Sequence, residues 1–172
     1  MIRLGISSPG RSGKDEAAEY LAKFTPLRYI GGTSWFARHY MLGYMTADGH
    51  DYADAGQCWD DRHEHRQTWA DAIALYNQDD PIRLYRDCMK EQDILTGVRW
   101  LNEFQACKAA NLVDLWVWIE RPGIEPDPTC QIRAEDCDIT ILNTGTLEEY
   151  RARLRRFANF LNKSRSFLTS CQ

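Results

Sequence analysis

The chain has 172 residues, enough for one domain with a substantial core, and its hydrophobic fraction of 44% excludes a disordered chain. Its 21 Lys and Arg residues against 25 Asp and Glu residues leave a net charge of −4, which gives no support to avid, non-specific nucleic-acid binding. The six cysteines lack metal-like spacing, and the sequence has neither a signal-peptide pattern nor an apolar run of membrane-spanning length. We therefore expect reduced thiols, a cytoplasmic location and no contact with a membrane.

Short apolar runs alternate with helical patterns along the chain. The apolar runs predict five strands, at 2–6, 27–30, 93–98, 113–119 and 137–142. The helical patterns predict helices at 14–24, 33–45 (capped by Thr33 or Ser34), 58–77, 80–91, 100–110 and 146–163, with a polar loop at 46–57. Strands separated by helices are typical of an α/β fold, in which a parallel sheet is covered on both faces.

The stretch "SSPGRSGKD" (7–15) follows the first predicted strand and opens the first predicted helix. It approaches the phosphate-loop pattern G-x-x-x-x-G-K-[ST], with Ser8 in place of the first glycine and Asp15 in place of the final hydroxyl residue. Gly10 and Gly13 let the backbone turn its amides inward, and the helix that follows directs its positive end to the same point. Lys14 adds a point charge for the outer phosphates. The sequence therefore predicts a phosphate-binding loop.

The cofactors predicted with this loop are ATP and Mg²⁺. Arg11 lies inside the loop and is predicted to contact phosphate. Two interpretations of Asp15 stay open: its carboxylate holds Mg²⁺ directly or through water, or it only caps the helix and leaves Ser12 and other groups to complete the metal site.

Four segments carry a family resemblance: "RSGKD" with its helix, "ILTGVR" (94–99), "LWVWIERPG" (115–123) and "CDITILNTGTLEEY" (137–150). They resemble the phosphate loop, the arginine-ended core strand, the R-P-G turn and the N-x-G-[ST]-L-E-E segment of bacteriophage deoxynucleoside monophosphate kinases. The family has an aspartate where Gly97 stands here, and the middle of the chain matches loosely. The resemblance implies a P-loop NTPase fold over residues 1–172, a nucleoside monophosphate kinase-like three-layer sandwich with a five-stranded parallel sheet.

The resemblance also implies roles for residues outside the loop. Arg99 would hold the acceptor or the transferring phosphate, and Arg121 would close over ATP from a lid-like loop at about 121–136. Asn143 and Gly145 would contact the base of the nucleotide. Because phosphoryl transfer needs positioning and positive charge, the predicted catalytic residues are Lys14, Arg99, Arg66 and Asp15.

The acceptor is expected to bind the helical insert at residues 31–90. Arg62 and Arg66 lie four positions apart in a predicted helix, so they would share a face and grip an acceptor phosphate. Trp35, with Phe36, Tyr40 and Trp59, is a candidate to stack on a base, although aromatic residues at helical spacing also suit a core.

Three functions fit these observations. The leading one is transfer of the γ-phosphate of ATP to a deoxynucleoside monophosphate. The second keeps ATP and takes DNA as the acceptor, as in related phage kinases that phosphorylate 5-hydroxymethyluracil during thymidine hypermodification. The third is a nucleotide-binding module without catalysis. The sequence leaves base specificity and a homodimer open, and a phage origin would place the protein in the host cytoplasm.

Overall fold

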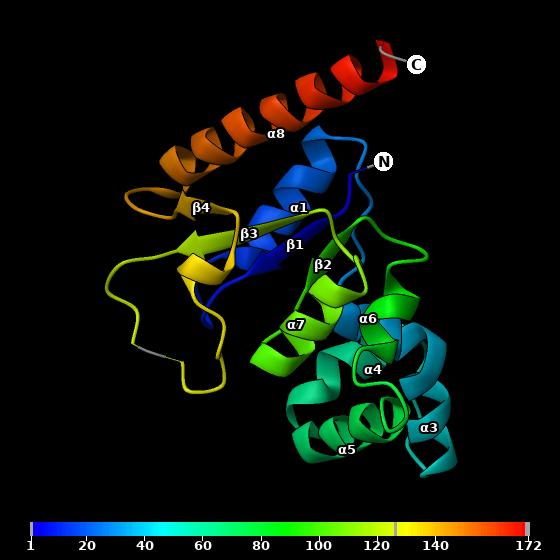
Figure 1. The fold of residues 1–172 in the computed structure, drawn as a ribbon. Coiled ribbons are helices and arrows are strands. Elements are labelled where there is room, and N and C mark those ends of the chain that lie inside the picture. The colour runs from blue at the N-terminus through cyan, green and yellow to red at the C-terminus, as the bar shows by residue number, and fades with distance from the viewer. Residues whose placement is uncertain (1, 126, 171–172) are drawn as a thin grey trace.

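The computed structural model describes residues 2–125 and 127–170, the last six of these by their backbone alone. Within this part of the chain, four strands form one wholly parallel sheet in the order β2-β1-β3-β4 (Figure 1). The strands are β1 (Leu4–Ser7), β2 (Ile94–Thr96), β3 (Leu115–Glu120) and β4 (Ile139–Leu142). The α/β class and the parallel sheet predicted from the sequence are thus confirmed.

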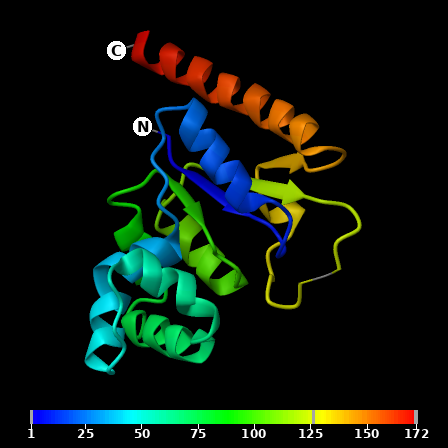
Figure 2. The same cartoon turned by 180° about the vertical axis from the view of Figure 1, so that it is seen from behind.

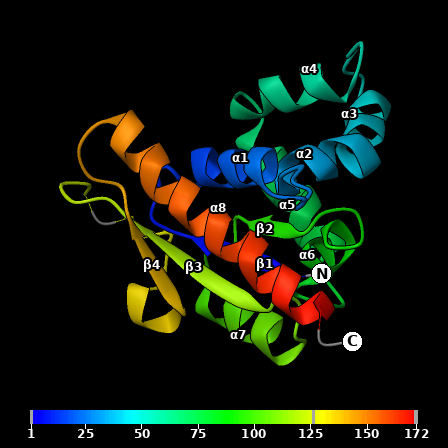
Figure 3. The same ribbon diagram turned by 90° about the horizontal axis from the view of Figure 1, so that it is seen from above.

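Helices cover both faces of the sheet. Helices α1 (Lys14–Phe24) and α8 (Leu147–Ser170) lie over one face, and α7 (Leu101–Ala109) lies over the other (Figure 3). Strand β3 serves both sides, because Val117 packs with α1 and α8 whereas Trp116 packs with α7. The Trp116 ring lies so close to Gly5 on β1 that a side chain there would collide with it.

Residues 32–88 form a helical lobe with its own apolar core, at the end of the molecule away from α8 (Figures 1 and 2). Its elements are α2 (Gly32–Phe36), a π-helix (Ala37–Met41), α3 (Leu42–Ala47), α4 (Ala55–Asp60), a 3₁₀ turn (Asp61–His63), α5 (Arg66–Tyr76) and α6 (Arg83–Cys88). The lobe occupies the region that the sequence assigned to a helical insert.

The strand predicted at 27–30 is absent from the described sheet, so the expected fifth strand is wrong. The segment does run beside β2, since the Arg28 carbonyl accepts a hydrogen bond from the amide of Asp93 at 2.8 Å. Side chains take the other positions of the ladder: the Asp93 carboxylate accepts from the Arg28 amide, and the Gln92 side-chain carbonyl accepts from the amides of Ile30 and Gly31. Backbone pairing therefore stops after one residue.

The helix predicted at 58–77 is broken, because the chain turns between α4 and α5. Arg62 folds back at the break: its guanidinium lies 3.5 Å from the centroid of the Trp59 ring and donates to the Trp59 carbonyl at 2.7 Å. Arg62 and Arg66 consequently do not share the face of one continuous helix, contrary to the prediction.

Other boundaries differ by smaller amounts. The helix predicted at 33–45 begins at Gly32 with Gly31 as its N-cap, so the predicted Thr33 or Ser34 cap is wrong. Helix α4 starts inside the predicted 46–57 loop, because the Asp54 carboxylate caps it by accepting from the Gln57 amide. Among the described residues, no helix combines the length and apolar character needed to cross a bilayer.

Candidate active site

The glycine-rich loop (residues 8–13) joins the carboxyl end of β1 to the start of α1, as predicted. Its carbonyls are held from outside the loop. The Asn143 side-chain amide donates to the Ser12 carbonyl at 2.8 Å, and the Tyr150 hydroxyl donates to the Gly13 carbonyl at 3.0 Å. The Arg121 guanidinium donates to the Arg11 carbonyl at 3.2 Å. With its oxygens anchored outward, the loop keeps the shape in which peptide amides can face an anion.

Two residues of this loop have left-handed backbone angles. Gly13 has φ of 92° and caps α1, and Arg11 has φ of 64°. A methyl group on Gly13 would lie 2.6 Å from the side-chain nitrogen of Asn143. Glycine is therefore required at position 13 both by its backbone angle and by its neighbour.

The Lys14 cavity, of about 410 Å³, opens beside the loop. Residues from three parts of the chain line it: Lys14 and Asp15 from α1, Tyr29, Gly31, Thr33, Trp59 and Arg62 from the lobe and its approach, and Thr96, Gly97 and Arg99 from the end of β2. It thus lies where the carboxyl ends of neighbouring parallel strands meet, the usual ligand position in open α/β sheets. Four of the predicted site residues, Lys14, Asp15, Arg62 and Arg99, come together here.

Arg66 lines a different space. The Arg66 hollow, of about 350 Å³, adjoins the Lys14 cavity and shares Thr33 and Arg62 with it. Within it the Arg66 guanidinium lies 3.3 Å from Nδ1 of His63. The structure thus separates Arg66 from Lys14, with which it was grouped as catalytic.

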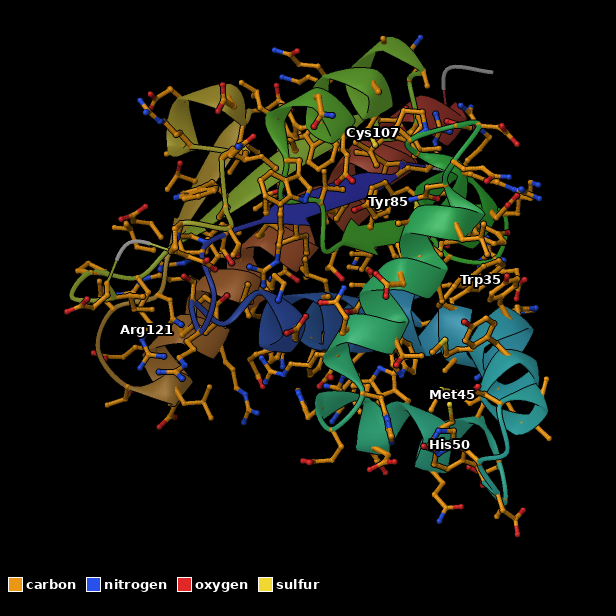
Figure 4. All side chains as sticks on the ribbon, turned by 90° about the horizontal axis from the view of Figure 1, so that it is seen from below. Trp35, Met45, His50, Tyr85, Cys107 and Arg121 are labelled. Atoms are coloured by element: carbon orange, nitrogen blue, oxygen red, sulfur yellow. The ribbon has the colours of Figure 1, made fainter. Side chains whose placement is uncertain are left out.

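On the far side of the loop lies the Arg121 hollow, of about 560 Å³. It is lined by Gly10, Arg11, residues 121–125 and Asp127. Arg121 therefore faces the loop from the predicted lid-like segment, well away from the lobe that holds Trp35 (Figure 4).

Arg99 is paired with a residue that sequence reasoning missed. One oxygen of Asp127 accepts hydrogen bonds from the Arg99 guanidinium and from the Gly10 amide, both at 2.8 Å. Arg99 also donates to the Thr129 hydroxyl at 2.6 Å. Asp127 lies in the lid-like segment predicted at about 121–136, where nothing in the sequence pointed to a contact with the glycine-rich loop 117 positions away.

The predicted metal ligands lie in different surroundings. The Asp15 carboxylate is 64% exposed in the Lys14 cavity and forms an ion pair with Lys14 at 3.0 Å, whereas Ser12 is buried. Across the described residues, no three His, Cys, Asp or Glu side chains are grouped to hold a metal ion.

Trp35 is not a lining residue of the Lys14 cavity. It is 6% exposed, belongs to the core of the helical lobe and donates its indole N–H to Glu91 at 2.9 Å. Contrary to the prediction, Trp35 does not face the Lys14 cavity, where a base could stack on it. Trp59 lines the cavity instead, with its indole N–H bonded to the Thr33 hydroxyl at 3.0 Å.

Asn143 and Gly145, predicted to contact a base, hold local structure here. Asn143 anchors the glycine-rich loop through its hydrogen bond to the Ser12 carbonyl. Gly145 has φ of 77° in the turn before α8, where the Thr146 hydroxyl and the Glu149 carboxylate cap the helix reciprocally.

Tyr29 was also missed as a cavity residue. Its hydroxyl lies 3.1 Å from that of Thr96, and burial raises the pKa of Tyr29 to about 12. It therefore remains a neutral hydrogen-bonding group in the cavity at physiological pH.

The fold and site define an α/β protein with an anchored glycine-rich loop between two cavities. A scan against models of protein families finds no match to this chain, and a search of curated proteins finds none either.

Proposed function

We propose that the protein is an ATP-dependent phosphotransferase that transfers the γ-phosphoryl group of ATP to a deoxynucleoside monophosphate. The observation that carries this proposal is the convergence of Lys14, Arg62 and Arg99 on one cavity at the start of α1. Three cations around one space suit a reaction whose transition state spreads negative charge over phosphoryl oxygens.

The fold proposed with this function is that of a P-loop nucleoside monophosphate kinase. Its support is the strand order together with the segment 27–30, which runs beside β2 and pairs with its approach at Arg28 alone. The R-P-G turn at 121–123 and the helical lobe would then take the positions of lid and acceptor-binding insert.

The two spaces beside the loop suggest that ATP and the acceptor bind at different places. ATP would lie with its nucleoside part in the Arg121 hollow and its phosphates along the glycine-rich loop toward Lys14. The acceptor phosphate would lie in the Lys14 cavity, held by Arg62. In the reaction the acceptor oxygen forms a bond to the γ-phosphorus, the bond to the β-phosphate oxygen breaks, and ADP leaves.

Mg²⁺ fits this site through Asp15, whose exposed carboxylate lies beside Lys14 and offers the hard oxygen ligand that Mg²⁺ prefers. Ser12 is the less favourable ligand because it is buried. The ion, when bound with ATP, supplies charge neutralisation at the phosphates.

A second acceptor is favoured by one observation. The Arg66 hollow extends the cationic surface beyond the Lys14 cavity through the shared Arg62, which would accommodate a further phosphate of a DNA strand. The alternative proposal is therefore phosphorylation of the hydroxymethyl group of 5-hydroxymethyluracil in DNA.

The test is transfer of label from γ-labelled ATP with Mg²⁺ to four deoxynucleoside monophosphates, 5-hydroxymethyl-dUMP, and duplex DNA containing 5-hydroxymethyluracil, in parallel. Label on a free nucleotide supports the first acceptor, and label on DNA alone supports the second. Lys14→Ala should abolish transfer with an unchanged circular dichroism spectrum. Lys23→Ala, at the other end of the same helix, should transfer normally. Full activity of Lys14→Ala, or no transfer to any acceptor, would contradict the proposal.

A further inference from the structure

The carboxylate of Asp127 is bound as an anion by the glycine-rich loop. One of its oxygens accepts from the Gly10 amide and from Arg99, and the other accepts from the amide and the hydroxyl of Thr129, at 2.9 and 2.6 Å. The two carboxylate oxygens of Asp127 thus accept four hydrogen bonds in all, and the side chain is 17% exposed. Such a set of donors is also what a phosphate oxygen requires.

The backbone of Gly10 lies close to the Asp127 carboxylate. A methyl group on Gly10 would stand 3.0 Å from the carboxylate oxygen that its amide binds. The contact is therefore between backbone and carboxylate at close range, as in a loop that receives phosphate.

The contact lies at the boundary between the two spaces of the site. Gly10 and Asp127 line the Arg121 hollow, whereas Arg99, bound to the same oxygen, lines the Lys14 cavity. A phosphoryl group that passes from a nucleotide on one side to an acceptor on the other must cross this boundary.

Protonation does not release Asp127 near neutral pH. Hydrogen bonds from Thr129 and then Gly10, with the charge of Arg99, hold the pKa of its carboxyl well below the usual range. The group is therefore a full anion under physiological conditions, and a competing anion is the means by which its donors become free.

We propose that Asp127 is an intramolecular competitor for the position of the terminal phosphate of ATP. In the free protein its carboxylate occupies Gly10 and Arg99. When ATP binds, the terminal phosphate displaces it and takes over Arg99, and the segment 127–133 moves away from the loop. This inference rests on the proposed function for the identity of the nucleotide, but the anion site itself does not.

The exchange keeps Arg99 paired with an anion in both states, so neither state leaves a partly buried cation without a partner. It also couples occupancy of the loop to the position of the segment that carries Asp127, because both anions need the same two donors.

The experiment is calorimetric binding of ATP, ADP and inorganic tripolyphosphate to the wild-type chain, Asp127→Asn and the control Asp136→Asn. Asp136 caps the same region by accepting from the Arg133 amide and is remote from Gly10 in sequence and contact. Removing the competing charge should raise affinity for ATP and tripolyphosphate about tenfold, since a closed state populated about ten to one lowers apparent affinity by that factor. ADP, which lacks the terminal phosphate, should gain much less, and Asp136→Asn should bind as the wild type does.

Unchanged or weaker ATP binding by Asp127→Asn overturns the inference. So does an equal gain for ATP and ADP, because the carboxylate would then not compete with the terminal phosphate. Thr129→Ala provides a second variant if Asp127→Asn fails to fold: it removes the hydroxyl donor to the second Asp127 oxygen, leaves the amide donor in place and should give a smaller gain. Tighter tripolyphosphate binding without transfer to any acceptor would uphold the inference while refuting the phosphotransferase. Transfer to an acceptor by the wild-type chain, with no gain in ATP affinity from Asp127→Asn, would support the phosphotransferase and refute the inference.

Discussion

Replacing Gly13 with alanine tests how firmly Asn143, in the turn after β4, holds the glycine-rich loop. The backbone angle alone should reduce the free energy of unfolding by about 1–2 kcal/mol, because the β-carbon crowds the carbonyl in the left-handed region. The added methyl also displaces Asn143, and loss of its bond to the Ser12 carbonyl should remove about 1 kcal/mol more. The expected loss is therefore about 2–3 kcal/mol, or a fall in melting temperature of roughly 5–10 °C.

Two other glycines separate these effects. Gly123 has φ of 79° and nothing within 4 Å of an added methyl, so Gly123→Ala should show the backbone effect alone, a loss of about 1–2 kcal/mol. Gly43 lies in α3, also with open space, and Gly43→Ala should stabilise the protein by about 0.5–1 kcal/mol. Urea unfolding followed by circular dichroism measures all three variants.

A Gly13→Ala variant that is no less stable than Gly123→Ala would contradict this role of Asn143. In that case the Asn143 side chain would be free to move aside, and the loop would not be fixed by the turn that follows β4.

Two further predictions concern the site and the fold. Arg62→Ala should raise the KM for the acceptor roughly tenfold or more, and Arg66→Ala much less, because only Arg62 lines the Lys14 cavity. Steady-state kinetics would show this, and a larger effect at Arg66 would move the acceptor into the Arg66 hollow. Asp93→Asn should lower the free energy of unfolding by about 2 kcal/mol, because the Arg28 amide and guanidinium lose their charged acceptor. Arg28 holds the pKa of Asp93 below its usual value, so this stabilisation is present above about pH 4 and is lost as the pH falls further. Urea unfolding at pH 7 and pH 3 should therefore show a smaller difference between wild type and variant at the lower pH, and an equal difference at both would contradict it.

The strong periodic segments of the fold could be predicted from the sequence. The helix at 14–24 was predicted to the residue and the helix at 100–110 to within one residue at each end, because apolar residues recur there at helical spacing. The start of the last helix was predicted to within one residue, but α8 continues seven residues past the predicted end at 163. The strand predicted at 27–30 is wrong because the amides of this segment donate to the side chains of Gln92 and Asp93, which periodicity does not reveal. The break at Arg62 likewise depends on a local contact with Trp59 that helical spacing does not predict.

The site was predicted where one local pattern contained it. The loop at 7–15 could be predicted from its glycines, its lysine and the strand and helix on either side of it. Trp35 and Trp59 could not be told apart, because both lie in helical patterns and only packing decides which faces the cavity. Asp127 lies in a proline-rich turn whose partner is 117 positions away, so no short motif could have found it.

The anchoring of the glycine-rich loop has a consequence for biosynthesis. Asn143 and Tyr150, which hold its carbonyls, are 131 and 137 positions from the residues they bind, and Arg151 pairs with Glu16 across a similar separation. During translation the loop emerges well before the residues that anchor it. Contacts of such long sequence separation form late in folding. A nascent chain therefore exposes its glycine-rich loop without these anchors until the start of α8 has left the ribosome.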